Sequence, residues 1–490
     1  MTESSIEASE TAFERHLSAP RGRGPVPEGA TVGSAGGGVC DDMVRFALRV
    51  ADGRIADVTF DAEGCGATIA AASACIELVE GAPLLRAAHV GSGDIAAALG
   101  GLSPGKRHAA AVAADAFHRT LTNLLAGAVE PLISRSGNRV LVAMSGGVDS
   151  AVAALLARET DEEVIAVTLK LWSDPLTDGT KSCCSPQAVV SARALAHSMG
   201  LPHVTLDLRE RFRDAVVADF LGEHDRGRTP NPCVRCNGFV RFDAMLQAAD
   251  RLGAETLVTG HYARIVREPE GPLLARGLDP AKDQAYMLSA LDPGSLERIR
   301  FPLGEMCKPA VRRLAREAAL PVAEKKESQD LCFMAGTSRR QFLARHAAAR
   351  DKEGEIVDRS GRVLGRHRGH RHYTVGQRRG LGVASGKPLF VLGKDAPRNR
   401  VVVGEFEELA VGKLEISPAR LYRDGERVDR VRLRYRSEPV ACRLERLRAG
   451  EHQTIAVHLE EPVHGIAPGQ TACLLDGDLV VGHGKIATAP

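Results

Sequence analysis

Alternating apolar and polar positions mark the first folded part of the chain. Residues 44–50 and 55–60 alternate in this way on either side of the turn residues 51–54, which predicts a β-hairpin. Helical periodicity then recurs over three segments, 67–80, 94–99 and 106–126. We therefore expect an α+β domain over residues 26–128, preceded by a disordered tail over residues 1–25.

A different pattern begins after a short linker, residues 129–138. Within residues 139–335, apolar strand-like segments alternate with helical ones; the strands are expected from 140 onward and at 164–170, 202–207 and 256–262, and the helices at 148–158, 187–200 and 239–252. This alternation predicts an α/β domain with a doubly wound, mainly parallel sheet. Ligands of such sheets bind beyond the carboxyl ends of the strands.

The remainder of the chain divides into a small basic domain, residues 336–408, and a strand-rich domain, residues 409–490. Residues 361–380 hold six arginines and three histidines and no acidic residue, which favours contact with phosphate. Residues 431–436 alternate apolar and basic positions, as expected for an edge or barrel strand with one charged face.

Composition narrows the classes of function. A net charge of +2 over 490 residues does not point to a partner, and an aromatic content of 4% disfavours base-stacking platforms. The odd number of cysteines, eleven, and the lack of an apolar signal segment favour reduced thiols in metal or sulfur chemistry over a disulfide framework. No apolar run approaches 18 residues, so we expect no membrane span and a cytoplasmic protein.

The clearest chemical motif spans residues 140–150, where an apolar strand enters a Gly-Gly turn and then a helix. Paired glycines bring backbone N–H groups close to an anion, two serine hydroxyls add donors, and the helix start adds its positive dipole end. Asp149 does not bind phosphate and is expected to hold Mg²⁺. The predicted nucleotide-binding residues, with two strand ends added, are Ala143, Met144, Ser145, Gly146, Gly147, Val148, Asp149, Ser150, Leu169 and Gly260.

The Ser-Gly-Gly-Val-Asp-Ser sequence of this motif resembles the loop of the ATP pyrophosphatase family. No Gly-Lys-Ser/Thr loop of the usual NTPase type occurs in the chain. Members of the family split ATP between the α and β phosphates and adenylate a carbonyl oxygen. The resemblance therefore implies ATP, with Mg²⁺, as the cosubstrate.

Four polar residues of the N-terminal domain lie near the ends of predicted elements: Cys40, Asp42, Cys65 and His108. Such a set suits a soft metal or a persulfide. Residues 60–69 and 102–108 resemble the iron-sulfur scaffold proteins of the IscU and NifU N-terminal type. That family has a cysteine directly after the histidine, where this chain has Ala109, so both a metal or sulfur-relay role and a docking role stay open.

Two cysteine-bearing segments, 227–237 and 327–333, occur together with Lys282-Asp-Gln284 and with residues 373–382. In combination they resemble the bacterial tRNA-specific 2-thiouridylases, from about residue 138 to the end. The resemblance implies ATP-dependent conversion of a wobble uridine to 2-thiouridine and a C-terminal β-barrel. It also implies tRNA and a sulfur donor, such as a cysteine desulfurase or a sulfur relay, as partners.

The same resemblance implies roles for Cys236, as the nucleophilic thiol, and for Cys332, as the persulfide carrier, with Asp149 as the third catalytic residue. Many members have an aspartate where this chain has Cys233. Cys233, Cys236 and Cys332 would leave one iron of a [4Fe-4S] cluster free to bind sulfide. Persulfide chemistry without metal and a structural zinc, with a fourth ligand from Cys183 or Cys184, are the alternatives.

The residues that the resemblance assigns to tRNA contact are Asn231, Pro232, Cys233, His261, Lys282, Asp283, Gln284, Arg434, Tyr435 and Gln470. Gln470 could instead serve a turn, and His261 could satisfy a carbonyl at a strand end. Two other functions stay open: another ligase or amidotransferase of the ATP pyrophosphatase family, and an iron-sulfur scaffold or carrier with an RNA-binding body. The intact phosphate loop speaks against the second.

Overall fold

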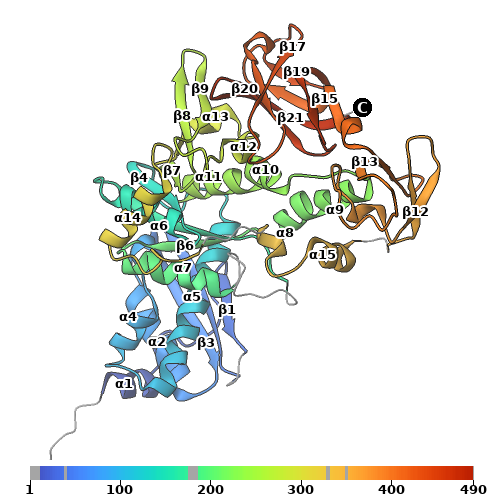
Figure 1. The fold of residues 1–490 in the computed structure, drawn as a ribbon. Helices are drawn as coiled ribbons and strands as arrows, with labels where there is room; N and C mark the ends of the chain where they lie inside the picture. Colours follow the sequence, from blue (N-terminus) through green and yellow to red (C-terminus); the bar gives the residue numbers. More distant parts are fainter. Residues whose placement is uncertain (1–10, 38–40, 175–185, 327–330, 348–350, 489–490) are drawn as a thin grey trace, which may run out of the picture.

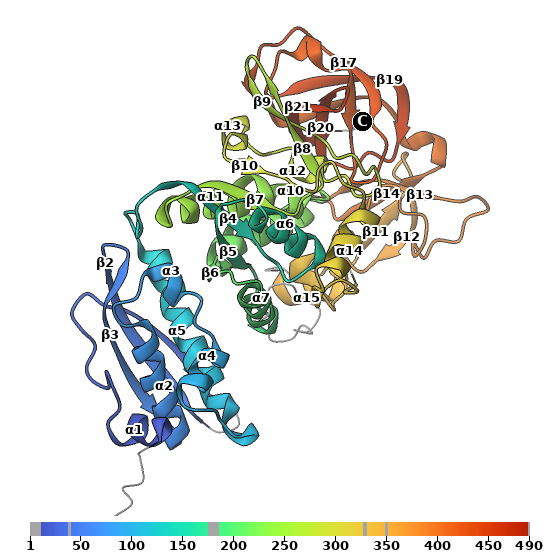
Figure 2. The ribbon, with the colours of Figure 1, turned by 90° about the vertical axis from the view of Figure 1, so that its left-hand side faces the viewer.

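The computed structural model describes residues 11–37, 41–174, 186–326, 331–347 and 351–488. The N-terminal domain lies at one end of the molecule and the C-terminal barrel at the other, with the parallel sheet between them (Figure 1). The same order along the molecule is visible after a quarter turn (Figure 2). No helix among the described residues has both the length and the apolar character to cross a membrane.

The N-terminal domain packs helices on a three-stranded antiparallel sheet of order β1-β2-β3. The predicted hairpin is confirmed as β2 (Met43–Ala51) and β3 (Arg54–Glu63), joined by a tight turn. The sheet also contains β1 (Thr31–Gly36), which was not predicted. The predicted helices are present, accompanied by two short ones: α2 (Gly66–Val79), α3 (Leu84–Ala87), α4 (Ser92–Ala98), η1 (Pro104–Lys106) and α5 (Arg107–Gly127).

The predicted disordered tail is wrong for the part that the structure describes, residues 11–25. Helix α1 (Ala12–Ser18) begins with a capping box, in which the Thr11 side chain and Glu14 satisfy each other's backbone N–H groups. His16 is 2% exposed, and its Nδ1 lies 2.9 Å from the Ser73 hydroxyl on α2. This buried contact and the cap hold the segment against the domain.

The predicted doubly wound sheet is confirmed as five parallel strands in the order β10-β7-β4-β5-β6. Val140 and Val142 of β4 face the core that contains α6 and α14, whereas Leu141 faces the opposite core. The strands are β4 (Ser136–Ala143), β5 (Glu163–Lys170), β6 (His203–Asp207), β7 (Ala254–Thr259) and β10 (Ile299–Arg300).

The helices of this domain lie on both faces of the sheet and beyond its strand ends. Those that matter for the site are α6 (Val148–Arg158), α7 (Pro186–Ser198), α10 (Pro232–Cys236), α11 (Phe242–Arg251) and α14 (Lys308–Glu317). The others are α8 (Arg209–Phe212), η2 (Arg213–Val217), α9 (Ala218–Asp225), η3 (Asn237–Arg241), α12 (Ala285–Leu288), α13 (Pro293–Leu296) and η4 (Cys332–Met334).

The central domain combines one helix, α15 (Arg339–His346), with a four-stranded sheet of order β12-β11-β14-β13. Its strands are β11 (Gly354–Val357), β12 (Val363–His367), β13 (Phe390–Asp395) and β14 (Arg400–Gly404). Two short helical turns, η5 (His370–His372) and η6 (Phe406–Leu409), complete the described part.

The C-terminal barrel is closed by pairing of β15 with β21. Its sheet runs β18-β15-β19-β17-β16-β20-β21-β9-β8, so two strands from the middle of the chain, β8 (Ala263–Glu268) and β9 (Gly271–Arg276), extend it. The others are β15 (Ala410–Leu421), β16 (Arg430–Arg432), β17 (Val440–Leu444), β18 (Gly450–His452), β19 (Ile455–His464), β20 (Thr471–Asp476) and β21 (Leu479–Thr488), with η7 (Gly425–Arg427).

The prediction of an edge or barrel strand with a charged face over residues 431–436 is confirmed only in part: β16 is a barrel strand. Strand β16 ends at Arg432 and lies between β17 and β20, so it is not an edge. Arg432 is only 5% exposed, because its guanidinium forms an ion pair with the buried Asp283 carboxylate at 2.5 Å. Arg434 and Arg436 are exposed, so the basic residues of this segment divide between a buried ion pair and the surface of the barrel.

Candidate functional site

The phosphate loop connects β4 to α6 and is held by its own serines. Gly146 adopts a φ of 69°, a conformation that favours glycine, and Gly147 caps α6. The Ser145 N–H donates to the Ser150 hydroxyl at 3.1 Å, and that hydroxyl donates to the Gly147 carbonyl at 3.0 Å. The loop is therefore preorganised, and the first N–H groups of α6 receive no side-chain cap, which makes the helix start suited to an anion.

A cavity of about 240 Å³ lies beside this loop, at the carboxyl ends of the strands. Gly260 borders it, and a Cβ atom there would lie 2.8 Å from the Asp149 carbonyl, so only glycine lets the end of β7 approach α6. Seven predicted nucleotide-binding residues line the cavity: Ala143, Met144, Ser145, Asp149, Ser150, Leu169 and Gly260. Gly146, Gly147 and Val148 lie in the loop but not in this lining, and Val148 is buried.

Asp149 has partners that the sequence analysis missed. The Lys308 ammonium, at the start of α14, lies 2.6 Å and 2.8 Å from its two carboxylate oxygens, and the Tyr262 hydroxyl donates to it at 2.7 Å. The Lys325 ammonium donates to the Gly146 carbonyl at 2.8 Å. Two lysines from the segment after the sheet therefore bracket the phosphate loop.

His261 and Gln284 also line the cavity. His261 Nδ1 lies 2.8 Å from the Thr259 hydroxyl rather than from a strand-end carbonyl. Burial, with a smaller contribution from Arg241, lowers the pKa of His261 to about 3, so the ring is neutral at physiological pH. The Gln284 side-chain oxygen accepts from the Tyr262 N–H at 2.9 Å. Both predicted tRNA contacts therefore border the nucleotide cavity.

Asn231 begins the helix that carries two of the predicted catalytic cysteines. Its side-chain oxygen accepts from the N–H groups of Cys233 and Val234, at 3.2 Å and 3.3 Å, and Pro232 is buried at the first position of α10. Cys233 and Cys236 are three residues apart, which is about one helical turn, so they lie on the same side of α10.

Cys332 joins Cys236 in one apolar cluster. Cys236 is a buried member of this cluster, together with Leu171 and Phe333, and Cys332 is a partly buried residue packed against the cluster. Leu171 also lines the nucleotide cavity, so the cavity and the cysteine cluster adjoin at this residue. Residues 327–330 and Cys183 and Cys184 lie outside the described residues.

The environment of Cys233 keeps its thiol protonated. Burial, and secondly the nearby Cys236, raises the pKa of Cys233 to about 11. Arg235 forms an ion pair with Asp219 at 3.6 Å. Without a bound metal or substrate, Cys233 is therefore a neutral thiol rather than a thiolate.

The remaining predicted tRNA contacts fall into two groups: side chains engaged by partners within the protein, and side chains that are at least partly accessible. Asp283 is buried against Arg432, and its carboxylate accepts from two backbone N–H groups, so a direct contact of this side chain with RNA is not compatible with the structure. The Gln470 amide donates to the Thr229 carbonyl at 2.8 Å and to the Pro230 carbonyl at 3.4 Å, which fixes the loop before α10. Lys282 and Tyr435 are half-buried and Arg434 is exposed.

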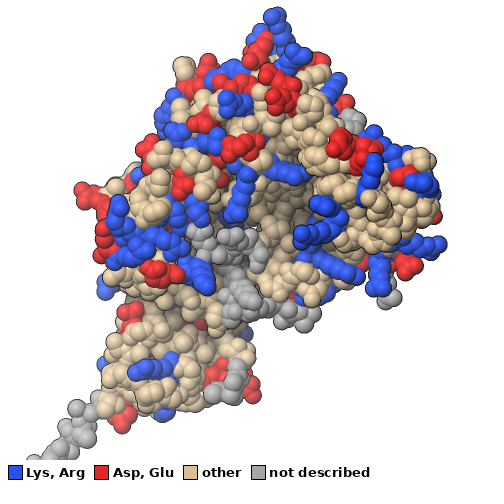
Figure 3. All heavy atoms as spheres, viewed as in Figure 1, with Lys and Arg blue, Asp and Glu red and all other residues tan. Residues whose placement is uncertain are grey.

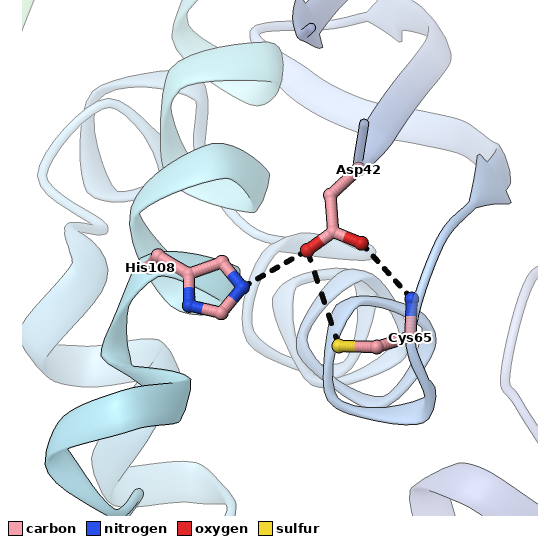
Figure 4. A group of neighbouring side chains, drawn as sticks. All are labelled: Asp42, Cys65 and His108. Carbon is pink, nitrogen blue, oxygen red and sulfur yellow. Dashed lines mark hydrogen bonds and ion pairs between the residues drawn. The ribbon is translucent and has the colours of Figure 1, made fainter. Parts of the chain in front are cut away.

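Three predicted residues of the N-terminal domain meet at one point (Figure 4). Asp42 lies 2.9 Å from His108 Nε2 and 3.9 Å from Cys65 Sγ, and it accepts from the Cys65 N–H at 2.9 Å. Among the described residues, this is the only group of three or more histidine, cysteine or acidic side chains whose ligand atoms all lie within 4.8 Å of one another. Cys40 lies outside the described residues, and Ala109 is buried.

Four known protein families match consecutive parts of the chain. Residues 9–128 match the NifU-like N terminal domain, and residues 138–336 match the tRNA methyl transferase HUP domain. Residues 340–405 match the tRNA methyl transferase PRC-barrel domain, and residues 417–486 match the aminomethyltransferase beta-barrel domain.

Relatives are similar either over the whole chain or over its last three quarters. The chain is 48% identical over 487 residues to the bifunctional protein NifU/MnmA of Rubrobacter xylanophilus, a match that covers 96% of this chain and 97% of the relative. It is 43% identical over 367 residues to the tRNA-specific 2-thiouridylase MnmA of Geobacter metallireducens, covering 73% of this chain and 99% of that protein. The corresponding protein of Zymomonas mobilis is 42% identical over 355 residues, which is 72% of this chain and 94% of the relative.

Proposed function

Since the chain belongs to the family of bifunctional NifU/MnmA proteins and is a tRNA 2-thiouridylase, we propose that adenylation and sulfur transfer occur in one continuous cleft. The observation that carries this proposal is the position of Leu171, which lines the nucleotide cavity and packs in the cluster with Cys236 and Cys332. A base held between the two would have ATP on one side and the thiols on the other.

Adenylation makes the uridine oxygen a better leaving group. The O2 atom of the wobble uridine attacks the α phosphorus of ATP, and pyrophosphate leaves. The loop, fixed by its internal hydrogen bonds, would hold the phosphates through the N–H groups at the start of α6, which receive no side-chain cap. Lys308 and Lys325 would supply positive charge to the departing pyrophosphate, and Asp149 would offer a carboxylate to Mg²⁺ bound by the phosphates, which is the usual mode of Mg²⁺ binding.

Sulfur then attacks C2 of the adenylated base, and AMP leaves. We assign this sulfur to the site formed by Cys233, Cys236 and Cys332, whose donor set of three thiols fits a [4Fe-4S] cluster with one iron open to sulfide. A single zinc ion fits less well, because these sulfur atoms do not form a group with ligand atoms all within 4.8 Å among the described residues. Cluster thiolates bind different irons and do not need this closeness.

The N-terminal site is assigned a separate role. Asp42, Cys65 and His108 would hold a metal ion, or bring a persulfide to Cys65 from a sulfur donor such as a cysteine desulfurase. Fusion to the thiouridylase would then deliver sulfur within one chain at high effective concentration. Release of a persulfide sulfur as sulfide requires attack by a second thiol, which ends in a disulfide with the carrier cysteine. The variant Cys65→Ala tests this role. Lower thiolation with a protein sulfur donor, together with normal thiolation with inorganic sulfide, would support it.

Replacement of Asp149 tests the proposed function. We expect Asp149→Ala to lose tRNA-dependent AMP formation by about 100-fold or more, because the metal contact and the partner of Lys308 are removed together. Binding of tRNA should persist, measured by filter retention. Asp161→Ala, an exposed aspartate of the same domain, is the matched control and should behave as wild type. Wild-type thiolation by Asp149→Ala would contradict the assignment.

A further inference from the structure

A second pocket lies in the central domain, outside the cleft described above. It has a volume of about 630 Å³ and is bordered by the start of α15, the end of β12 with the residues after it, and residues 377–382. Arg340, Arg366 and Arg368 line it, and none of its lining residues is acidic. All three arginines are exposed. The pocket therefore presents positive charge without an internal counter-charge.

Five other arginines of this domain are ion-paired. The partners are Glu408 for Arg359, Asp358 for Arg362, Asp225 and Asp351 for Arg371, Asp395 for Arg398 and Glu355 for Arg400, at distances from 2.9 to 3.4 Å. By contrast, no carboxylate in the described part of the chain lies within 4.0 Å of the guanidinium groups of Arg340, Arg366 or Arg368. The same holds for the exposed Arg378 and Arg379, which lie between the lining residues Gln377 and Gly380, so arginines without an acidic partner within 4.0 Å lie in or next to the pocket lining.

Two further cations near the pocket have neutral partners. Arg339 donates to the Thr374 hydroxyl and to the His372 carbonyl, and Lys394 donates to the Tyr373 carbonyl at 3.0 Å. Burial, and secondly Arg339, lowers the pKa of Lys394 to about 8. Neither cation has an acidic partner among these contacts, so both add positive charge beside the pocket.

The pocket is physically connected to the cysteine cluster. Helix α15 contributes Phe342 to the cluster that contains Cys236, while the first residues of the same helix line the pocket. Eight residues of α-helix span roughly 12 Å, so the two sites lie within a few nucleotides of each other along an RNA strand. On the face seen in Figure 3, lysine and arginine side chains border a hollow between the barrel, the central domain and the parallel-sheet domain.

We propose that this pocket binds a phosphodiester group of the tRNA backbone close to the nucleotide that is thiolated. The proposal rests on the proposed function and adds a binding site to it. Arginine suits this task, since its planar guanidinium donates two parallel hydrogen bonds to phosphate oxygens. The contact positions the RNA and carries no sequence information, so it should serve every tRNA substrate equally.

The double variant Arg366→Gln/Arg368→Gln tests this site. We expect the affinity for tRNA, measured by filter binding, to fall about tenfold, and the slope of log affinity against log salt to fall by about two. The KM for tRNA should rise with kcat at saturating tRNA retained, because neither residue touches the cleft. The control is Arg359→Gln/Arg362→Gln, which removes two exposed arginines that are ion-paired in the same domain.

Unchanged tRNA affinity and salt slope in the double variant would overturn the phosphate site while leaving thiolation by the wild type intact. Loss of tRNA-dependent AMP formation in the wild type would instead contradict the proposed function. Arg340→Gln, on α15, provides a second variant on a different element and should lower the slope by about one. Inorganic phosphate added at constant ionic strength provides a further test. If it shifts the tRNA affinity of the wild type but not that of the double variant, the site would be assigned to free phosphate instead.

Discussion

The parallel-sheet domain contacts a neighbour at each end, and the two interfaces are built differently. The barrel shares strands with it: β9 pairs with β21, and the buried Asp283 binds Arg432. The N-terminal domain instead lays α5 against the edge strand β6. The contacts there include the backbone N–H of His203, which donates to the Ala88 carbonyl at 3.2 Å.

This difference shows that the barrel is a structural part of the cleft, whereas the N-terminal domain is an attached module. Asp283 directly precedes Gln284, which lines the nucleotide cavity, and Gln470 of the barrel fixes the loop before α10. The barrel is therefore part of the frame of the active site. The N-terminal domain instead faces α7 across a pocket of about 590 Å³, lined by Asp42 and His108 on one side and Arg193 on the other.

The largest effect is expected when the barrel interface is broken. Arg432→Met leaves the Asp283 carboxylate buried without its main cation, which should lower the free energy of unfolding by about 3–5 kcal/mol. Thiolation should fall with it, because the contact lies beside the cleft. Urea denaturation followed by circular dichroism measures the change.

The matched control for this variant is Arg430→Met, in the same strand. Arg430 and its partner Asp429 are 53% and 50% exposed, so the loss should stay below about 1 kcal/mol. Equal losses in the two variants would show that the buried ion pair does not hold the barrel in place.

A smaller effect is expected at the N-terminal interface when the pH falls. Burial lowers the pKa of His197 to about 4 and those of His118 and His203 well below the usual value, with secondary contributions from His89 and Arg193. The docked form keeps these rings neutral, whereas the undocked form takes up protons below pH 6.5. Docking should therefore be complete above pH 6.5 and weaken as the pH falls toward 4.

Small-angle scattering and hydrogen exchange in α5 measure this weakening. Asp115, which lies 3.5 Å from Arg193, and Asp94 are the acidic groups near the histidines and should moderate the effect. His197→Gln should reduce the pH dependence, since a neutral amide does not titrate. A radius of gyration that stays constant from pH 7 to pH 4.5 would contradict the role assigned to these rings.

Local motifs were predictable and long-range partners were not. The phosphate loop is contiguous in sequence, so eleven residues are enough to predict its strand, its glycines and its helix start. Lys308, by contrast, lies 159 residues from Asp149, and the two meet because α14 packs on α6. No spacing rule links them.

Two misjudged elements have physical reasons. Strand β1 consists of Thr-Val-Gly-Ser-Ala-Gly, which lacks the bulky alternation that marks a strand, and it is held by pairing with β2. Helix α1 had a readable signal, since Thr11 and Glu14 form a capping box at the expected spacing. The ion pair of Asp283 with Arg432 could not be predicted. A charged residue is rarely buried unless it is paired, and nothing in the local sequence of Asp283 indicates a partner so far away in the chain.

Anaerobic purification with iron and sulfide analysis, joined to assays of AMP and 2-thiouridine, tests the three-cysteine site most directly. We expect about four irons per chain in the thiolating wild type, and Cys233→Ala should lose them together with 2-thiouridine while still forming AMP. Iron that remains in Cys233→Ala would place the metal at Asp42, Cys65 and His108. Active protein without iron would contradict the cluster and return the chemistry to a persulfide on Cys332 with Cys236 as the nucleophile.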